Sequence, residues 1–329
     1  MNLANHKFYQ DIKELLQQAR SKIYHTINTT MTQTYYEIGK KIVQEEQGGA
    51  TRAEYGQRLI ENLSVELTSE FGSGFSVRNL MNMRRFYVSY EKSQTVSAKF
   101  VLSWSHYIFL LRLENIDERK FYEIESELNN WSLRELKRHF NSGLFERLTL
   151  SRDKIKTKEL ATQGQIIASA KDLIKDPYIL EFIGLPEQAS YSESKLEQKL
   201  IDKMEHFLLE LGKGFTFVAR QKRITLDEKH FKVDLVFYNR LLKSFVLIDL
   251  KIGELKHQDL GQMMMYVNYF DEYEKTEDEN KSIGIILCKD KSKALVELTL
   301  PKDNDQIYAS KYLTVLPNKE EFKRLLEEE

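Results

Sequence analysis

Two acidic side chains and a lysine interrupt apolar stretches in the second half of the chain, and their spacing suits hydrolytic chemistry. Asp234 lies within residues 233–238, and Asp249 and Lys251 lie within residues 246–251. Both stretches have the Val, Ile, Leu and Phe content of buried strands. An ionised carboxylate is costly there unless a cation or hydrogen-bond donors compensate it. Side chains two apart on a strand share a face, so Asp249 and Lys251 project together. The pattern indicates a site for a divalent cation and a water nucleophile.

The two aspartates are expected on one side of a sheet. If their strands pair as a hairpin through residues 239–243, the carboxylates approach each other, and a divalent cation would relieve their repulsion. Oxygen ligands suit Mg²⁺ or Mn²⁺, and the pattern offers no Cys/His set for zinc. Lys251 would orient or deprotonate the attacking water, or neutralise charge in the transition state. The alternative interpretation of these residues is a structural salt bridge within the sheet.

The first half of the chain is expected to be helical. All four prolines lie beyond residue 176, and apolar residues recur before it at three-to-four spacing. The predicted helices span residues 8–28, 30–47, 53–71, 76–91, 103–114, 117–129 and 132–148. The turn residues 71–75 join two of these helices in a way that resembles a helix-turn-helix.

Basic side chains gather on the helices that begin at Ser76 and Ser132, serines that are good N-caps. Such helices can lie in a groove or along phosphates. The net charge of -1 means that any nucleic-acid contact must come from local patches. The alternative is that these patches are solvated faces of packed helices. The predicted nucleic-acid contacts are Arg78, Arg84, Arg85, Arg134, Arg138 and, on the first strand of the second half, Arg220.

The second half alternates between helical and strand periodicity. We expect helices at 192–211 and 257–273, strands at 215–226, 230–239, 244–252, 283–288 and 312–316, and a short helix from Lys319. The order is αβββαβ. The predicted fold class is therefore a two-domain α+β chain: an all-α, helix-turn-helix-like domain at 1–150, a linker at 151–175 and an α/β domain at 176–329.

The ordered acidic motifs resemble the PD-(D/E)xK nuclease superfamily, and the surrounding residues resemble the bacterial YhcG-type proteins. The segments that carry this resemblance are 217–221, 234–239, 248–251 and 283–288, with 103–107 and 129–132 in the first half. Together they extend the resemblance over most of the chain. Val233 departs from the superfamily name, which implies a proline before the first acid. Asp249 is an acid that the pattern allows in place of Glu.

The resemblance implies further site residues and an activity. It implies that Glu197, on the helix before the sheet, completes a metal site with Asp234 and Asp249, and Glu193 is the reserve candidate. It also favours Gln262 as a catalytic residue, because a neutral amide can hold a phosphate oxygen or a water. The implied protein is a Mg²⁺-dependent endodeoxyribonuclease in a bacterial genome-maintenance, mobile-element or defence setting.

Two other function classes stay open. One is a nucleic-acid-binding or assembly protein whose nuclease fold is catalytically silent or partner-activated. The other is a transcription factor that binds duplex through residues 1–150. The expected partners are nucleic acid, DNA above all, a second copy of the chain, and a protein bound by the helical domain. The lone Cys288 and the lack of a signal peptide or membrane-spanning run favour a cytoplasmic protein with no membrane role.

Overall fold

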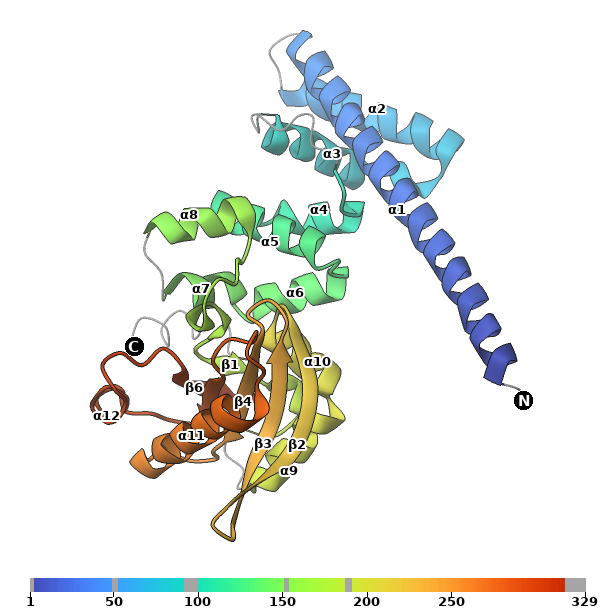
Figure 1. Ribbon diagram of the computed structural model, residues 1–329. Coiled ribbons are helices and arrows are strands. Elements are labelled where there is room, and N and C mark those ends of the chain that lie inside the picture. Colours follow the sequence, from blue (N-terminus) through green and yellow to red (C-terminus); the bar gives the residue numbers. More distant parts are fainter. Residues whose placement is uncertain (1–2, 49–52, 92–99, 151–153, 187–190, 317–329) are drawn as a thin grey trace. The chain divides into compact units, whose positions relative to one another are not determined.

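The computed structural model of the chain describes residues 3–48, 53–91, 100–150, 154–186 and 191–316. The chain forms two compact units, residues 1–137 with 161–164, and residues 138–160 with 165–329. Where described, the first unit is helical and the second contains one six-stranded sheet covered by helices (Figure 1). The predicted two-domain α+β class is confirmed. The finer division at residues 150 and 175 stays a prediction.

Helix α1 (Leu3–Gly48) is a single helix of 46 residues, where the sequence predicted two. The polar residues near the expected break do not interrupt it, and threonine hydroxyls there bond back to carbonyls one turn earlier. Thr26 Oγ1 donates to the Lys22 carbonyl, and Thr34 Oγ1 donates to the Thr30 carbonyl, each over 2.9 Å. Within the described residues, neither this helix nor any other combines the length and apolarity that a membrane crossing requires.

Helices α2 (Ala53–Phe71) and α3 (Val77–Tyr90) pack with α1 around a core that includes Leu80 and Met83. The 3₁₀ turn η1 (Ser73–Phe75) joins α2 to α3 at the predicted turn. Gly39 of α1 lies against the backbone of α3, where a methyl group would clash with the Met83 carbonyl oxygen. Glycine at this position therefore sets the close spacing of α1 and α3.

Of the later helices, the one predicted at 117–129 matches within one residue, the one predicted at 103–114 ends at Leu110, and a helix at Lys154–Gln163 lies in the segment predicted as a linker. Residues 132–148 form two helices, because Gly143 takes a left-handed conformation with φ 57° between them. The helices are α4 (Trp104–Leu110), α5 (Ile116–Leu128), α6 (Leu133–Asn141), α7 (Leu144–Leu150) and α8 (Lys154–Gln163). Residues 138–160 belong to the unit that contains the sheet.

The sheet has the strand order β1-β6-β5-β4-β3-β2. Strands β2, β3 and β4 are antiparallel neighbours, whereas β4, β5, β6 and β1 run parallel. The strands are β1 (Tyr178–Ile179), β2 (Phe215–Leu226), β3 (Lys229–Asn239), β4 (Ser244–Leu250), β5 (Ile283–Cys288) and β6 (Ile307–Leu313). The αβββαβ order is confirmed, with the last strand earlier than predicted. The helix expected from Lys319 lies outside the described residues.

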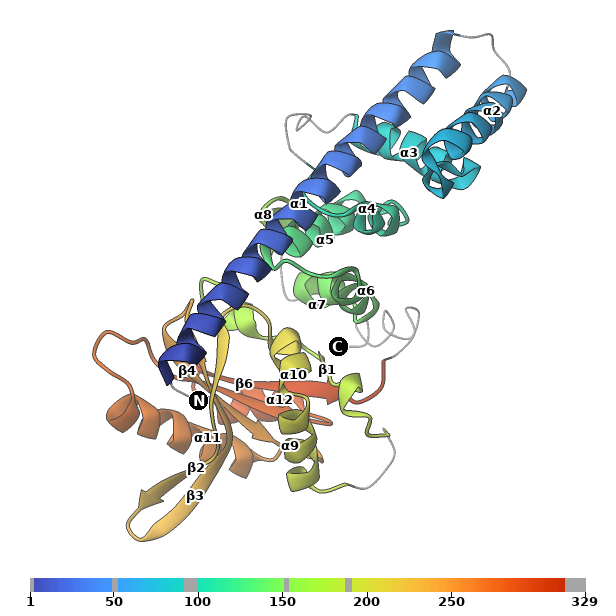
Figure 2. The ribbon, with the colours of Figure 1, turned by 90° about the vertical axis from the view of Figure 1, so that its right-hand side faces the viewer.

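Helices cover both faces of the sheet (Figure 1, Figure 2). Helices α9 (Glu193–Asp202) and α10 (Met204–Leu211) pack on one face, against Leu235 and Ile248 among others. Helix α11 (His257–Tyr269) packs on the other, against Val236 and Leu247. Alternate residues of β3 and β4 thus serve opposite faces. The predicted single helix 192–211 is two helices, which meet at Lys203. The other elements are α12 (Lys293–Thr299), the 3₁₀ turns η2 (Ala170–Leu173) and η3 (Glu181–Ile183), and the π-helical η4 (Phe270–Glu274).

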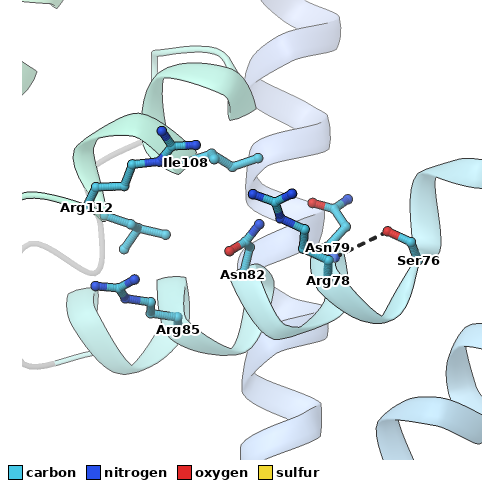
Figure 3. A pocket seen from close by; sticks show the side chains of 8 residues that line it. Ser76, Arg78, Asn79, Asn82, Arg85, Ile108 and Arg112 are labelled. Atoms are coloured by element: carbon cyan, nitrogen blue, oxygen red, sulfur yellow. Dashed lines mark hydrogen bonds between the residues drawn. The ribbon is translucent and has the colours of Figure 1, made fainter.

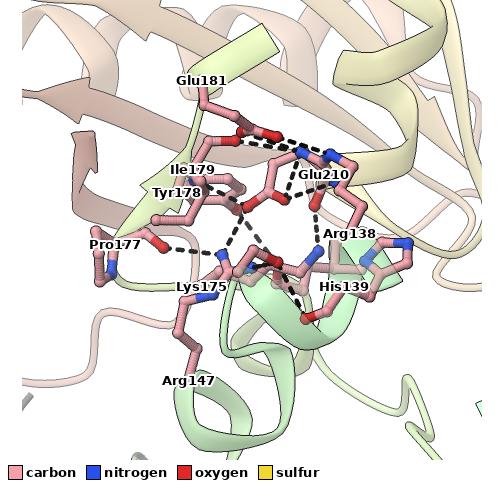
Figure 4. A network of polar contacts seen from close by, with 11 residues as sticks. Arg138, His139, Arg147, Lys175, Pro177, Tyr178, Ile179, Glu181 and Glu210 are labelled. Atoms are coloured by element: carbon pink, nitrogen blue, oxygen red, sulfur yellow. Dashed lines mark hydrogen bonds and ion pairs between the residues drawn. The ribbon is translucent and has the colours of Figure 1, made fainter. Parts of the chain in front are cut away.

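Within the unit that contains the sheet, a buried ionic network links Arg138 and Arg147 to Glu181 and Glu210 (Figure 4). Arg147 Nη1 lies 2.6 Å from Glu210 Oε1, and both side chains are fully buried. Arg138 Nε lies 3.0 Å from Glu181 Oε1, and Arg138 Nη2 lies 3.4 Å from Glu210 Oε2. Burial alone would raise the pKa of Glu210, but the charges of Arg147, Lys175 and Arg138 outweigh it and lower this pKa to about 2. Glu210 is therefore ionised and fully compensated.

Candidate active site

The carboxyl end of β4 carries the acid–lysine pair. Asp249 is 3% exposed within an otherwise apolar strand, and Lys251 follows directly after the strand ends. Lys251 Nζ lies 2.7 Å from Asp249 Oδ2. The two side chains project together, as the strand spacing predicts. The backbone N–H of Lys251 donates to the Leu287 carbonyl over 2.8 Å, which ties this end of β4 to β5.

Asp234 lies beside this pair on β3. Leu235 opposes Ile248 in the antiparallel register, so Asp234 falls one step beyond the last paired residues, next to the end of β4. Its Oδ2 accepts a hydrogen bond from the backbone N–H of Leu250 over 2.9 Å. The carboxylate thus takes the place of a strand partner where β3 and β4 diverge. The two aspartates come from adjacent strands, as predicted.

Gln221 of β2 is a site residue that the sequence reasoning missed. Its Nε2 donates to Asp234 Oδ1 over 3.0 Å and to Glu197 Oε2 over 2.7 Å. Its backbone has φ 47°, an uncommon left-handed conformation for a residue with a side chain. This conformation lies close to the register shift at Phe217 and Ala219. The available signal was its position at the end of the motif 217–221.

Glu197 reaches the site from α9. It is 3% exposed, and its Oε1 lies 3.1 Å from Arg220 Nε. Burial raises the pKa of Glu197 despite the opposing charge of Arg220, and the charge of Asp234 adds to the rise. Arg220 also donates from Nη1 to Gln198 Oε1 over 3.0 Å. The predicted metal ligand and the predicted nucleic-acid contact are therefore partners of each other.

Gln262 is held by Tyr266, one turn later on α11. The Gln262 amide donates to the Tyr266 hydroxyl, which in turn donates to the Lys232 carbonyl over 2.8 Å. The sequence indicated Tyr266 as helix packing, and its ring is buried in the core beneath α11. Burial raises the pKa of its hydroxyl, and the charges of Asp249 and Asp234 add to this rise. Both side chains therefore belong to the surroundings of the two aspartates.

The acid–lysine pair is electrostatically unusual. Burial raises the pKa of Asp249 to about 7; Asp234 and Glu193 also raise it, and the charge of Lys251 opposes the rise. Burial would lower the pKa of Lys251, but the carboxylate of Asp249 outweighs this and raises it. An additional positive charge beside Asp249 would favour its ionised form.

The donor set suits a hard cation. Oδ2 of Asp249 and Oε1 of Glu197 are buried, and each has a basic side chain as its partner, Lys251 at 2.7 Å and Arg220 at 3.1 Å. With Asp234 they offer only oxygen atoms, the ligands that Mg²⁺ and Mn²⁺ prefer. Within the described part of the chain, however, no three His, Cys, Asp or Glu side chains form a ready cluster for a metal. A cation would compete with Lys251 for the buried oxygen of Asp249.

Comparison with known proteins identifies the family of this chain. Residues 171–327 match the family described as the YhcG PDDEXK nuclease domain, and residues 11–147 match the DUF1016 N-terminal domain. The Escherichia coli (strain K12) protein named "Putative nuclease YhcG" is 37% identical over 352 residues, which cover 98% of this chain and 92% of that protein. The chain belongs to the YhcG family of PD-(D/E)xK nuclease proteins. The family resemblance found in the sequence is confirmed.

Solved structures overlap this YhcG-family chain only in part. A "repair endonuclease from Pyrococcus abyssi" is 17% identical, with a TM-score of 0.26 over 38% of this chain and 49% of that chain. The structure described as "EndoMS-dsDNA2 complex" is 18% identical, with a TM-score of 0.28 over 40% of this chain and 49% of that chain. Overlaps of this extent carry no conclusion about substrate.

The arginines predicted to contact nucleic acid have different surroundings. Arg138 belongs to the buried network, with 16% of its side chain exposed. Arg84 is engaged by a glutamate of α1 at 2.6 Å. Arg134 is exposed on α6. Arg78 and Arg85 are exposed on α3, where both line a pocket (Figure 3).

Proposed function

We propose that this YhcG-family chain is a Mg²⁺- or Mn²⁺-dependent nuclease that hydrolyses phosphodiester bonds in DNA. The observation that carries the proposal is the pair of Asp249 and Lys251, 2.7 Å apart, beside Asp234 on the neighbouring strand. Family membership supports the nuclease class. The divalent cation is supported by the oxygen-only donors and by the burial of two of these carboxylates, Asp249 and Glu197.

Each side chain has a role in this proposal. Asp234 and Asp249 would hold the cation, and Glu197 would contribute from α9. When bound, the cation supplies positive charge at the phosphate and lowers the pKa of a water. Lys251 keeps its proton beside Asp249 and donates a hydrogen bond to the attacking water or to a phosphate oxygen, where negative charge develops. Gln262, oriented by Tyr266, donates a neutral hydrogen bond without adding charge.

The test is a cleavage assay of wild type and Asp249→Asn with Mg²⁺ or Mn²⁺. The substrates are duplex, single-stranded and branched DNA, and RNA. We expect metal-dependent cutting of DNA that falls at least about 100-fold in the variant, since an amide cannot replace the charged ligand. Asp227→Asn is the matched control, because Asp227 is exposed in the β2–β3 turn. Cutting by pure, folded Asp249→Asn at the wild-type rate would remove Asp249 from the mechanism.

A second candidate function is a nucleic-acid-binding or assembly protein whose nuclease fold is silent or partner-activated. It is favoured by the internal pairing of the site: Lys251 neutralises Asp249, and Gln221 occupies both Asp234 and Glu197. This function predicts nucleic-acid binding without turnover on every substrate of the panel. A dimer and a protein partner of the helical domain stay predictions, which light scattering of the purified chain would begin to test.

A further inference from the structure

A cavity of about 400 Å³ lies in the helical unit, between α3 and α4 (Figure 3). Helix α3 lines it with Arg78, Asn82 and Arg85, and α4 with the turn after it contributes Ile108 and Arg112. All of these residues belong to the first compact unit, whereas the candidate active site belongs to the second. The cavity is therefore a separate site.

The arginines of this cavity are not neutralised within the described chain. Arg78, Arg85 and Arg112 form no ion pair there, whereas Arg84, between two of them in sequence, is engaged by Glu46 at 2.6 Å. Three guanidinium groups around one cavity repel one another and concentrate positive potential in it. An anionic ligand would compensate this charge.

The walls of the cavity are held in place before any ligand binds. Asn79 donates from Nδ2 to the Gly74 carbonyl over 2.6 Å and accepts from Trp104 Nε1 over 2.9 Å, so it ties α3 to α4. The Trp104 ring packs on Phe86 of α3, with ring centroids 5.3 Å apart. The close contact of α3 with Gly39 fixes α3 from its other neighbour, α1. The helix positions from which the arginines project are therefore fixed, which reduces the ordering that binding an anion requires.

The spacing of the arginines distinguishes a polymer from a single phosphate. Arg78 and Arg85 are two helical turns apart, which corresponds to about 10 Å along the axis at about 1.5 Å per residue. Figure 3 shows both side chains on α3 and Arg112 on the turn after α4. Figure 3 also shows the three guanidinium groups apart from one another and not converging on one point, an arrangement that suits successive phosphates of a strand better than a single phosphate. Guanidinium forks suit each of them.

We propose that this cavity binds the phosphodiester backbone of nucleic acid across two or more phosphates. Arg78, Arg85 and Arg112 contact the phosphates, Asn82 supplies a neutral hydrogen bond, and Ile108 packs against a sugar or base. The proposal rests on the proposed function in one respect, namely that the chain acts on nucleic acid. It names the helical unit as the part that retains the substrate.

The test measures binding of the full chain to a labelled duplex and a labelled single strand in EDTA, by fluorescence anisotropy over a range of salt concentrations. For the triple variant Arg78→Gln, Arg85→Gln, Arg112→Gln we expect affinity to fall at least about 10-fold. The slope of log K against log salt should become shallower by about 2 to 3, because each phosphate contact contributes about 0.9. The same three positions as lysine should keep most of the slope, since the charge remains.

The matched control is Arg58→Gln, an exposed arginine of α2 outside the cavity. We expect it to change the slope by at most about 1. Equal binding by the triple variant and the control would overturn the proposal. Circular dichroism verifies that each variant is folded. If the triple variant is unstable, the double variant Arg78→Gln, Arg85→Gln replaces it, and its slope should become shallower by about 2.

This experiment separates the two proposals, because binding in EDTA needs no cleavage. If the chain binds through these arginines and never cuts any substrate, the cavity proposal is supported and the nuclease proposal is contradicted. If the chain cuts DNA, and the triple variant is as active as wild type at low DNA concentration, the nuclease proposal is supported and the cavity proposal is contradicted.

Discussion

At the scale of single residues, Gln221 is the contact that keeps two carboxylates of the candidate active site together. Its amide donates to both Asp234 and Glu197, which would otherwise repel each other. When a cation binds, the amide must lose its hydrogen bond to one of these carboxylates, or the carboxylate must contact both the amide and the cation. Gln221 is therefore a positioning residue, since it acts through the ligands and not on the substrate.

We predict that Gln221→Leu raises the Mg²⁺ concentration for half-maximal cleavage about 10- to 100-fold, as is typical when a partner of a metal ligand is removed. The titration of cleavage rate with Mg²⁺ measures this directly. Gln258→Leu, at an exposed position of α11, is the matched control. An unchanged Mg²⁺ requirement in the Gln221 variant would show that the amide does not orient the acids.

His139 gives a prediction about pH. Burial lowers the pKa of His139 to about 3, and the charges of Lys175 and Arg138 act in the same direction. The unfolded chain takes up this proton near its ordinary pKa of 6.5, so acidification favours unfolding between pH 6.5 and pH 3. Stability should fall by about 2 kcal/mol from pH 7 to pH 5 through this group, at about 1.4 kcal/mol per pKa unit.

Urea unfolding at both pH values, in wild type and His139→Gln, isolates that contribution. The glutamine cannot take up a proton, so the variant should lose about 2 kcal/mol less than wild type. The exposed His257 of α11, changed to glutamine, should leave the wild-type difference unaltered. An equal fall in wild type and His139→Gln would contradict the prediction.

The relative placement of the acids and the lysine could be predicted from the sequence, because the two aspartates interrupt apolar strands and Lys251 follows the second strand directly. Asp234, Asp249 and Lys251 needed only the period-two alternation to be placed on one side. Gln221 could not be found in this way, since its role depends on a left-handed backbone conformation and on the approach of α9. The partnership of Arg220 with Glu197 likewise depends on tertiary contacts that no local pattern encodes.

At the scale of elements, the spacing of α1 and α3 depends on Gly39. A methyl group there would meet the Met83 carbonyl, which is backbone and cannot rotate away. We predict that Gly39→Ala destabilises the helical unit by about 1 to 3 kcal/mol through overpacking, although alanine is the better helix former. It should also weaken nucleic-acid binding, because α3 carries Arg78 and Arg85.

Thermal unfolding of the full chain and the anisotropy assay check the Gly39 prediction. Gly74→Ala is the matched control, because nothing lies within 4 Å of a methyl group at that exposed position. A Gly39→Ala variant as stable as wild type would show that α1 and α3 adjust their spacing freely.

Long elements with strong periodicity were predictable, and short ones were not. Strand β2 matches its predicted range, because its side chains alternate between the two faces along most of its length and turns flank it at both ends. Strand β1 has two residues and no room for alternation; it is defined by its pairing with β6, where Tyr178 opposes Tyr312. Strand β6 begins earlier than predicted. One of its buried positions is the polar Ser310, so the sequence lacks the apolar alternation that would mark the strand.

At the scale of the whole molecule, a chain of net charge -1 has no general attraction for a polyanion. Affinity then depends on a few unpaired cations, and half of the six predicted arginines are not of this kind. Arg84, Arg138 and Arg220 are each engaged by a glutamate. The slope of binding affinity against salt concentration therefore reports how many unpaired arginines contact phosphates. It is the informative measurement for the intact protein.

The buried ion pair of Arg147 and Glu210 also determines which fragments of the chain can fold when they are expressed alone. A fragment that starts at residue 171, where the nuclease-domain match begins, lacks Arg138 and Arg147 but keeps Glu210 and Lys175. Loss of one side of a buried pair costs about 3 to 5 kcal/mol.

We predict that a fragment of residues 132–329 is recovered folded and that one of residues 171–329 is aggregated or molten, as near-ultraviolet circular dichroism would report. Well-folded 171–329 would mean that Lys175 alone suffices. The smallest piece of the chain that folds by itself is thus expected to be longer than the matched family domain.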